Sequence, residues 1–372
     1  KITISFRQLV IISLASILCF MKPVKHEMKN WGFRAFINNN VYDKTFLAQE
    51  YMDQNKISFG EFIALSLIEL DSAYDKIRYK KVDHDKIPEN IEKTNKHTKN
   101  IILIIGEASN VKRYGAYGYK LNTTPNLNKF QVDNHWCALQ KVHSPAAQTR
   151  VAVPMLVSFS SPEHKDFLFS YENILEIAKS EKYKTYWIDS QNGKDLWDKP
   201  FGFVEKYSDI HVSPTINNTK FNVDELRDDQ LLYPIQYYFK NSSGMSFFVI
   251  HLFGSHMPYN ENIDKNDQLE GLDVYDQSIH HTDMFISKVK SYADEYLKNY
   301  SLVYVPDHGE VVNYGHGYPS DTNEMYLIPV ISNDNYACSY LEKFRGDDGY
   351  ISSNDIKYLI LQYIGYDIKK NI

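Results

Sequence analysis

Four short apolar runs in the sequence each end in a side chain that can bind a metal ion or move a proton. These side chains are Glu107, Asp189, His251 with His256, and Asp307 with His308. Taken singly they are ordinary, because an acid after a strand usually caps a helix and a strand histidine is usually satisfied in the core. Together, four run ends with oxygen and nitrogen ligands predict a cation site. Carboxylate and imidazole ligands favour tetrahedral zinc first and manganese second.

A nucleophile for such a site is available in the segment 144–158, SPAAQTRVAVPMLVS. Thr149 follows small residues and precedes an apolar stretch that can begin a helix. A hydroxyl there would face free backbone N–H groups and the positive end of the helix dipole, which suits an incoming phosphate. The alternative is that Thr149 only caps the helix. A threonine hydroxyl also needs a metal or a base to remove its proton before it becomes a good nucleophile.

The apolar runs also indicate the elements that must position these side chains. The runs cover residues 100–107, 184–189, 247–252 and 301–307. Their length and composition are typical of strands buried on both faces of a parallel sheet. Helical patterns lie between them, for example at 171–182 and 276–299. This alternation predicts an α/β fold with helices on both sides of a sheet, whose site lies at the carboxyl ends of the strands.

The first part of the chain has a different texture. Residues 9–21 carry no charge, and at about 1.5 Å per residue they would span roughly 20 Å of the ~30 Å hydrocarbon core of a bilayer. Extending the run back to Ile2, with Arg7 reaching toward the interface, gives a spanning length. We interpret residues 1–29 as the last transmembrane helix of a longer chain and its flank. A signal-peptide core or a buried helix is the alternative.

Residues 30–99 are predicted to form amphipathic helices and a polar linker. The segment 59–77 places apolar residues at steps of three and four, so it forms a helix that lies on the membrane surface or packs on the next domain. The predicted domains are therefore 1–29, 30–99 and a catalytic domain at 100–372.

Charge and cysteine content narrow the protein class. The formal net charge of -6 over 372 residues argues against a nucleic-acid-binding protein, which usually has a basic surplus. Cys19 lies in the apolar run, so Cys137 and Cys338 are the only pair available to the rest of the chain. One optional disulfide does not settle the compartment, because a large domain can do without any.

Six segments then match a known family in its own order. They are IIGEASN…YGAYGYKLNTTPNL (104–127), QTRVAVPMLVS (148–158), YWIDSQNG (186–193), HLFGSHMPY (251–259), YDQSIHHTD (275–283) and PDHGE…HG (306–317). Together they resemble the bacterial phosphoethanolamine transferases of the alkaline phosphatase and sulfatase superfamily. The resemblance covers residues 100–330. It implies a sandwich in which a mixed, mostly parallel sheet lies between helices.

The resemblance also implies roles for individual residues. Glu107, Thr149, Asp307 and His308 correspond to the zinc ligands, with Thr149 as both ligand and nucleophile. The histidines His256 and His316 correspond to the pair that contacts phosphate oxygens or a second metal, and one of them would protonate the leaving group. In the SQNG segment, Asn192 and Lys194 correspond to substrate contacts, although the spacing at Lys194 departs from the family pattern.

The implied reaction moves phosphoethanolamine from phosphatidylethanolamine to lipopolysaccharide, at lipid A or the core, through a phospho-threonine intermediate that zinc activates. One zinc ion is expected, and the sequence leaves open whether one or two are bound during turnover. The implied protein is a monomer of the inner membrane with its catalytic domain in the periplasm. It would contact the membrane and both lipids, and it would not bind nucleic acid.

Two departures indicate a cysteine-poor branch. The family's Gly-Glu-Ser-x-Arg reads GEASN at 106–110, and the family's several disulfides around the nucleophile cannot form. A sulfatase is excluded, because Cys137 lacks the Cys/Ser-x-Pro-x-Arg setting. The remaining alternatives are a phosphoglycerol transferase of the lipoteichoic acid synthase type and a phosphodiesterase or phosphatase that uses water. A non-catalytic membrane scaffold would not require the intact ligand set.

Overall fold

The computed structural model describes residues 84–94, 96–133, 136–191, 193, 199–214, 221, 227–263, 268–317 and 321–369. All of them belong to one compact unit, Ser72–Ile372. The predicted membrane segment 1–29 and the amphipathic helix at 59–77 lie outside the described residues. Among the helices that are described, none has both the length and the apolar character needed to cross a bilayer.

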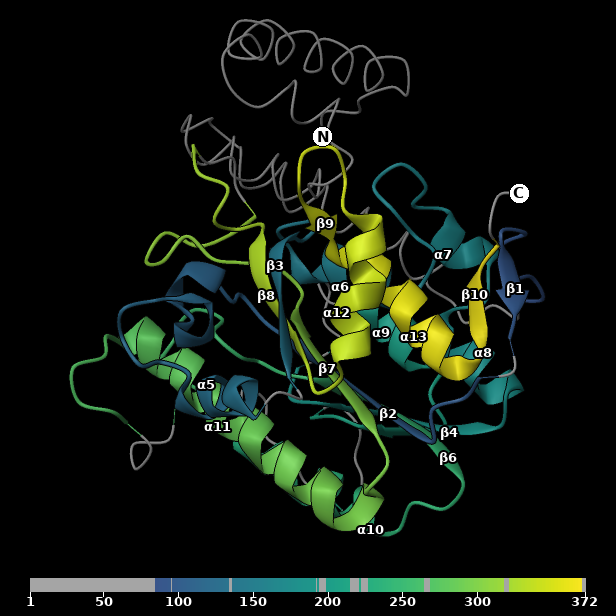
Figure 1. The fold of residues 1–372 in the computed structure, drawn as a ribbon, viewed down its shortest axis with the longest axis horizontal. Helices are drawn as coiled ribbons and strands as arrows, with labels where there is room; N and C mark the ends of the chain where they lie inside the picture. Colours follow the sequence, from purple (N-terminus) through teal and green to yellow (C-terminus); the bar gives the residue numbers. More distant parts are fainter. Residues whose placement is uncertain are drawn as a thin grey trace, which may run out of the picture. The chain divides into compact units, whose positions relative to one another are not determined.

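An eight-stranded sheet forms the centre of this unit (Figure 1). Its order is β5 (Ile210–Val212), β4 (Tyr183–Asp189), β6 (Met245–His251), β2 (Asn100–Gly106), β7 (Ser301–Pro306), β8 (Leu327–Ser332), β3 (Cys137–His143) and β9 (Ile351–Ser352). Neighbouring strands from β5 to β7 are parallel, and β8 is antiparallel to both β7 and β3. Within the described sheet, β8 alone runs in the opposite direction. The prediction of a mixed, mostly parallel sheet is therefore confirmed.

The central strand β2 shows why both faces of the sheet are covered. Its residues Ile101, Leu103 and Ile105 belong to one buried apolar cluster, whereas Ile102 and Ile104 belong to another. Successive side chains of a strand point to opposite faces, so each cluster fills one side of the sheet. A strand buried on both sides reads as a continuous apolar run, which explains the pattern at 100–107.

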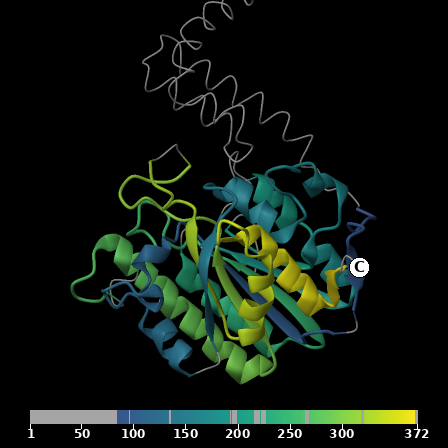
Figure 2. The same ribbon diagram turned by 45° about the horizontal axis from the view of Figure 1, so that its top comes forward.

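Helices cover the two faces unequally (Figures 1 and 2). One face carries α6 (Thr149–Val157), α7 (Phe167–Ser170), α8 (Ile174–Ser180), α9 (Lys199–Glu205), α12 (Asn335–Leu341) and α13 (Ile356–Ile364). The other face carries α5 (Pro125–Val132), α10 (Leu232–Lys240) and the long α11 (Val274–Tyr292). A separate antiparallel pair joins β1 (Ile91–Lys93) to β10 (Tyr366–Ile368).

The predicted strands and helices correspond to β2, β4, β6, β7, α8 and α11. The register brings the ends of the four strands to one edge, since Ile105 pairs with His251, His251 with Asp189, and Gly106 with Pro306. The pattern at 276–299 was assigned to one helix, but α11 ends at Tyr292 and a π-helical turn, Ala293–Leu297, follows.

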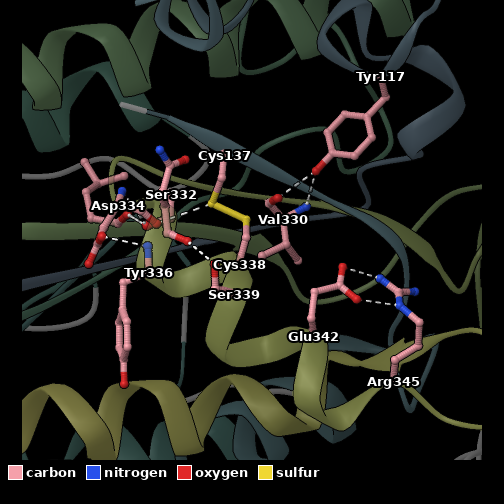
Figure 3. The surroundings of a disulfide bond; sticks show 12 residues. Tyr117, Cys137, Val330, Ser332, Asp334, Tyr336, Cys338, Ser339, Glu342 and Arg345 are labelled. Atoms are coloured by element: carbon pink, nitrogen blue, oxygen red, sulfur yellow. Dashed lines mark hydrogen bonds and ion pairs between the residues drawn. A yellow bond between two sulfur atoms is a disulfide. The ribbon is translucent and has the colours of Figure 1, made fainter. Parts of the chain in front are cut away.

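A disulfide joins strand β3 to helix α12 (Figure 3). Cys137, the first residue of β3, is bonded to Cys338 in α12, 201 residues along the chain. The bond therefore joins a strand to a helix that covers it. The pairing that the sequence left open is present in the structure.

Candidate metal and phosphate site

Four side chains meet where β2, β7 and α6 come together, and we call them the Thr149 centre: Glu107, Thr149, Asp307 and His308. Thr149 Oγ1 donates a hydrogen bond to Glu107 Oε2 at 2.8 Å and lies 3.4 Å from His308 Nε2. His308 Nε2 lies 3.1 Å from Glu107 Oε1 and 3.3 Å from Asp307 Oδ2. Both carboxylates and the imidazole are fully buried. The structure thus brings together the four residues that the sequence selected as ligands.

Backbone contacts hold Asp307, His308 and Glu107 in place. The Asp307 N–H donates to the Gly106 carbonyl at 3.0 Å, which joins the ends of β7 and β2. His308 Nδ1 lies 2.9 Å from the Gly309 carbonyl, so its Nε2 atom faces the centre. Gly254 approaches so closely that a Cβ atom there would lie 2.9 Å from the Glu107 nitrogen. Glycine is required at that position because the loop after β6 rests directly on Glu107.

Thr149 does not act as a helix cap. The cap residue of α6 is Gln148, and Thr149 is the first residue of the helix. Its hydroxyl is used in the hydrogen bond to Glu107 instead of a bond to the helix backbone. The hydroxyl is therefore placed at the N-terminus of α6 and beside the buried carboxylates, an arrangement that helix capping alone does not require.

The charges of the Thr149 centre are strongly perturbed. Burial and the nearby Glu107 raise the pKa of Asp307 well above its ordinary value. Burial would lower the pKa of His308, but the Asp307 and Glu107 carboxylates outweigh it and raise that pKa to about 10. Burial would also raise the pKa of Glu107, but His308 outweighs it and lowers that pKa. Without a metal ion, these shifts favour the protonated forms of Asp307 and His308. Both side chains bind a metal well only when they are deprotonated.

The donor set fits a cation. Glu107 Oε1 and Asp307 Oδ2 are buried and accept no hydrogen bond from the residues that the structure describes. Glu107, Asp307 and His308 each offer one ligand atom, and these three atoms lie within 4.8 Å of one another. A buried carboxylate oxygen without a donor is costly unless a cation or a proton neutralises its charge. A borderline divalent ion with tetrahedral preference matches two oxygen ligands, one nitrogen ligand and a hydroxyl.

His256 and His316 lie beside this centre. The rings of His308 and His316 are 4.2 Å apart between centroids, and those of His316 and His256 are 5.3 Å apart. Glu107, His256 and His316 form another group whose ligand atoms lie within 4.8 Å of one another. Unlike the buried ligands, both histidines are partly exposed. They can therefore reach a phosphate that enters from solvent.

Glu310 is a residue of this region that the sequence reasoning missed. It is fully buried, its Oε2 atom lies 2.7 Å from His316 Nδ1, and its Oε1 atom accepts a 2.7 Å hydrogen bond from the Tyr259 hydroxyl. This contact leaves His316 Nε2 as the ring nitrogen available to a substrate. Burial and the charge of His308 lower the pKa of His316. The sequence offered one signal for Glu310, because it is the last residue of the PDHGE motif.

Gln191 is the second residue that was missed. Its Nε2 atom lies 3.2 Å from Glu107 Oε2 and 2.7 Å from the Leu252 carbonyl, and it also lies 3.2 Å from His251 Nε2. His251 is fully buried, and burial lowers its pKa to about 4. His251 therefore supports Gln191 and does not join the four ligands. The sequence predicted that the residues at all four strand ends would bind one cation, and His251 departs from that prediction.

Asp189 also belongs elsewhere. It lies with Glu205 and His211 in a separate group of ligand atoms within 4.8 Å of one another. We call these three residues the Asp189 cluster. The expectation that all four strand ends serve one ion is wrong for this strand, because α9 and β5 supply Asp189 with partners of its own. The predicted substrate contacts Asn192 and Lys194 lie outside the described residues.

Comparison with known proteins agrees with this architecture. The family model described as Sulfatase matches residues 99–366. Phosphoethanolamine transferase EptC of Escherichia coli strain K12 is 22% identical over 256 residues, which cover 62% of this chain and 44% of that protein. Phosphoethanolamine transferase EptA of Helicobacter pylori is 26% identical over 257 residues, 62% of this chain and 47% of that protein. The chain therefore spans less than half the length of these two relatives.

Solved structures show the same fold. The zinc complex of the C-terminal periplasmic domain of EcEptC from Escherichia coli has a TM-score of 0.61 at 19% identity, covering 75% of this chain and 86% of that domain. The integral membrane lipooligosaccharide phosphoethanolamine transferase A from Neisseria meningitidis has a TM-score of 0.65 at 15% identity, covering 100% of this chain and 72% of that protein. The chain belongs to the sulfatase family of enzymes.

Proposed function

We propose that this chain is the catalytic part of a zinc-dependent phosphoethanolamine transferase. It would move phosphoethanolamine from phosphatidylethanolamine to lipid A or core lipopolysaccharide, outside the inner membrane. One observation carries the proposal: the Thr149 hydroxyl begins α6 and donates to Glu107 Oε2 at 2.8 Å, beside two further metal-ligand side chains. The names of the curated relatives support the phosphoethanolamine group.

The first step would be attack of Thr149 Oγ1 on the phosphorus of the donor lipid. The proton leaves along the existing hydrogen bond toward Glu107 Oε2. A zinc ion held by Glu107, Thr149, Asp307 and His308 would supply the positive charge that favours an ionised hydroxyl. The bond between phosphorus and the diacylglycerol oxygen breaks, and His316 or His256 gives that oxygen a proton. Phosphoethanolamine remains on Thr149.

The second step would reverse the roles. An acceptor hydroxyl or phosphate oxygen attacks the same phosphorus, and an acceptor hydroxyl gives its proton to the histidine that protonated diacylglycerol. The bond to Thr149 Oγ1 breaks, and that oxygen regains its proton from Glu107. The positive end of the α6 dipole and the two partly exposed histidines would stabilise charge on the non-bridging oxygens. Pre-positioned donors of this kind contribute about 2.7–4 kcal/mol each to transition-state stabilisation.

Exposed apolar side chains near the histidines support a lipid donor. Met257 follows the first histidine and is 39% exposed, and Tyr314 precedes the second and is 57% exposed. Apolar side chains around a polar entrance are suited to acyl chains that must stay out of water.

The decisive experiment uses full-length protein with phosphatidylethanolamine vesicles and lipopolysaccharide. Thr149→Ala should abolish transfer and leave the fold intact, while Thr149→Ser should keep part of the activity because it retains the oxygen. Mass spectrometry should find a phosphoethanolamine adduct on the peptide 148–158. Full activity in the alanine variant would remove Thr149 from the mechanism.

The acceptor mass in the same assay separates the alternatives. A structural neighbour, the lipoteichoic acid synthase LtaP from Listeria monocytogenes, has a TM-score of 0.54 at 14% identity, which shows a common fold only. Addition of phosphoglycerol to the acceptor would support that type of transferase. Release of the headgroup without any acceptor product would indicate a phosphodiesterase.

A further inference from the structure

The Asp189 cluster is built by three elements that meet on one face of the sheet. Strands β4 and β5 are parallel, and His211 pairs with Trp187. Asp189 lies two residues beyond Trp187, so the strand period places its side chain on the same face. Helix α9 covers that face and ends at Glu205. The convergence of the three side chains therefore follows from the strand register and the packing of one helix.

The spacing of the ligand atoms matches a metal site. His211 Nε2 lies 3.4 Å from Glu205 Oε2 and 3.7 Å from Asp189 Oδ2. Around a tetrahedral zinc ion with bonds of about 2.0–2.2 Å, ligand atoms lie about 3.3–3.6 Å apart. The corresponding distances from His308 Nε2 in the Thr149 centre are 3.1 and 3.3 Å. The two groups thus have nearly the same dimensions.

Burial and charge point the same way. Asp189 is 0% exposed and Glu205 is 3% exposed. Glu205 Oε2 accepts no hydrogen bond within the part of the chain that the structure describes. Buried carboxylates so close together need a cation or a proton between them.

The surroundings hold the ligands in place. Trp187 Nε1 donates a 2.7 Å hydrogen bond to Asp189 Oδ2, a contact that orients a metal ligand. A Cβ atom on Gly193 would lie 2.5 Å from Glu205 Oε1, so glycine allows the chain to pass the carboxylate. Gly193 and Asp189 flank Gln191, whose amide reaches Glu107. The cluster therefore supports the segment that contacts the Thr149 centre.

We propose that Asp189, Glu205 and His211 bind one zinc ion at a site separate from the Thr149 centre. The three ligands would join β4, β5 and α9, leaving one coordination position for water. Asp189 and Glu205 are buried, so we infer that the ion would hold the Gln191 segment in position. The site does not depend on the proposed transferase activity.

The test measures zinc bound to purified full-length protein after removal of loosely held metal. Glu107→Gln with Asp307→Asn disables the Thr149 centre, and this variant should still bind one equivalent of zinc. Adding Glu205→Gln or His211→Ala should remove that equivalent, whereas adding His256→Ala should not. Cobalt in place of zinc should give the absorption of a tetrahedral site in the same variants that retain zinc.

Each other result overturns the proposal. If the Glu107→Gln, Asp307→Asn variant binds no metal, the carboxylates of the Asp189 cluster are neutralised by protons or by other groups of the protein, and the cluster is not a metal site. If its metal is lost with His256→Ala and kept with His211→Ala, the ion belongs to the exposed histidines. If His211→Ala does not fold, the test is the melting temperature of the Glu107→Gln, Asp307→Asn variant. Added zinc must raise that temperature if the proposal is correct.

Discussion

The Thr149 centre and the Asp189 cluster combine two carboxylates and one imidazole at the same edge of one sheet, but their surroundings differ. The Thr149 centre adds a hydroxyl at the start of a helix and two partly exposed histidines. The Asp189 cluster adds the indole of Trp187 and the helix α9. Access and a nucleophile, not the ligand set, therefore distinguish a site that can react from one that can only bind.

Substitutions that keep the size of a carboxylate side chain but remove its charge, made at equivalent positions, give the largest expected difference between the two groups. Glu107→Gln removes a ligand and the hydrogen-bond acceptor of Thr149, so transfer should fall at least about 1000-fold. Glu205→Gln leaves every group of the Thr149 centre in place and acts only through the Gln191 segment. Its transfer rate should fall about 10-fold or less.

Initial rates with phosphatidylethanolamine vesicles measure both variants, and circular dichroism checks that each is folded. Asp229→Asn is a matched control, because Asp229 is paired only with exposed Arg227 among the contacts described. Equal losses in the two glutamate variants would contradict the distinction between a reacting site and a supporting one.

The next effect concerns Glu310, which lies beside the Thr149 centre and has no counterpart at the Asp189 cluster. Glu310→Gln keeps the size of the side chain but removes the charge 2.7 Å from His316 Nδ1. Outer partners of this kind typically contribute about 10–100-fold to activity, so kcat should fall by that factor while KM changes little. The pH dependence of kcat should also change, because His316 loses the neighbour that opposes the lowering of its pKa.

Two comparisons make this result specific. Tyr259→Phe removes the other hydrogen bond of Glu310 and leaves its charge, so its effect should be smaller. In a His316→Ala background, Glu310→Gln should add almost nothing. A full additional loss there would show that Glu310 acts independently of the histidine.

The sequence allowed the Thr149 centre to be predicted because its ligands follow buried strands of one parallel sheet. Such strands appear as unbroken apolar runs, and their carboxyl ends share an edge. Glu107, Asp307 and His308 could be selected on this ground. Thr149 required the family resemblance as well, because a threonine before a helix usually has a capping role.

The Asp189 cluster could not be predicted in the same way. Glu205 ends a short helix and His211 lies in a three-residue strand, so neither follows a strong apolar run. Their meeting with Asp189 depends on the pairing of β5 with β4, which short strands do not reveal in a sequence. Strand β3 was missed for a related reason, because it is only partly buried and its sequence is not continuously apolar.

The smallest expected effect on transfer comes from the disulfide, which is far from both groups. Strand β3 is antiparallel to β8, which is itself antiparallel to β7, so β3 runs in the direction of the main sheet. Its carboxyl end leads toward Thr149, and Cys137 begins its other end. The register places Cys137 level with Val303 and Leu103, so the disulfide lies four residues, about 13 Å along the strands, before Asp307 and Glu107.

Replacing Cys137 and Cys338 by alanine should therefore lower stability without changing chemistry. The bond closes a loop of 201 residues, and loss of such a cross-link typically costs about 2–4 kcal/mol of unfolding free energy. Urea titration under oxidising conditions measures this loss, and transfer assays well below the melting temperature should give an unchanged kcat and zinc content. Wild-type protein treated with a reductant should match the double variant in both measurements. A fall in kcat of the folded double variant would show that the disulfide region of β3 and α12 is coupled to the Thr149 centre. The reaction would then depend on more than the residues around the Thr149 centre, and the distinction between a reacting site and its supporting fold would fail.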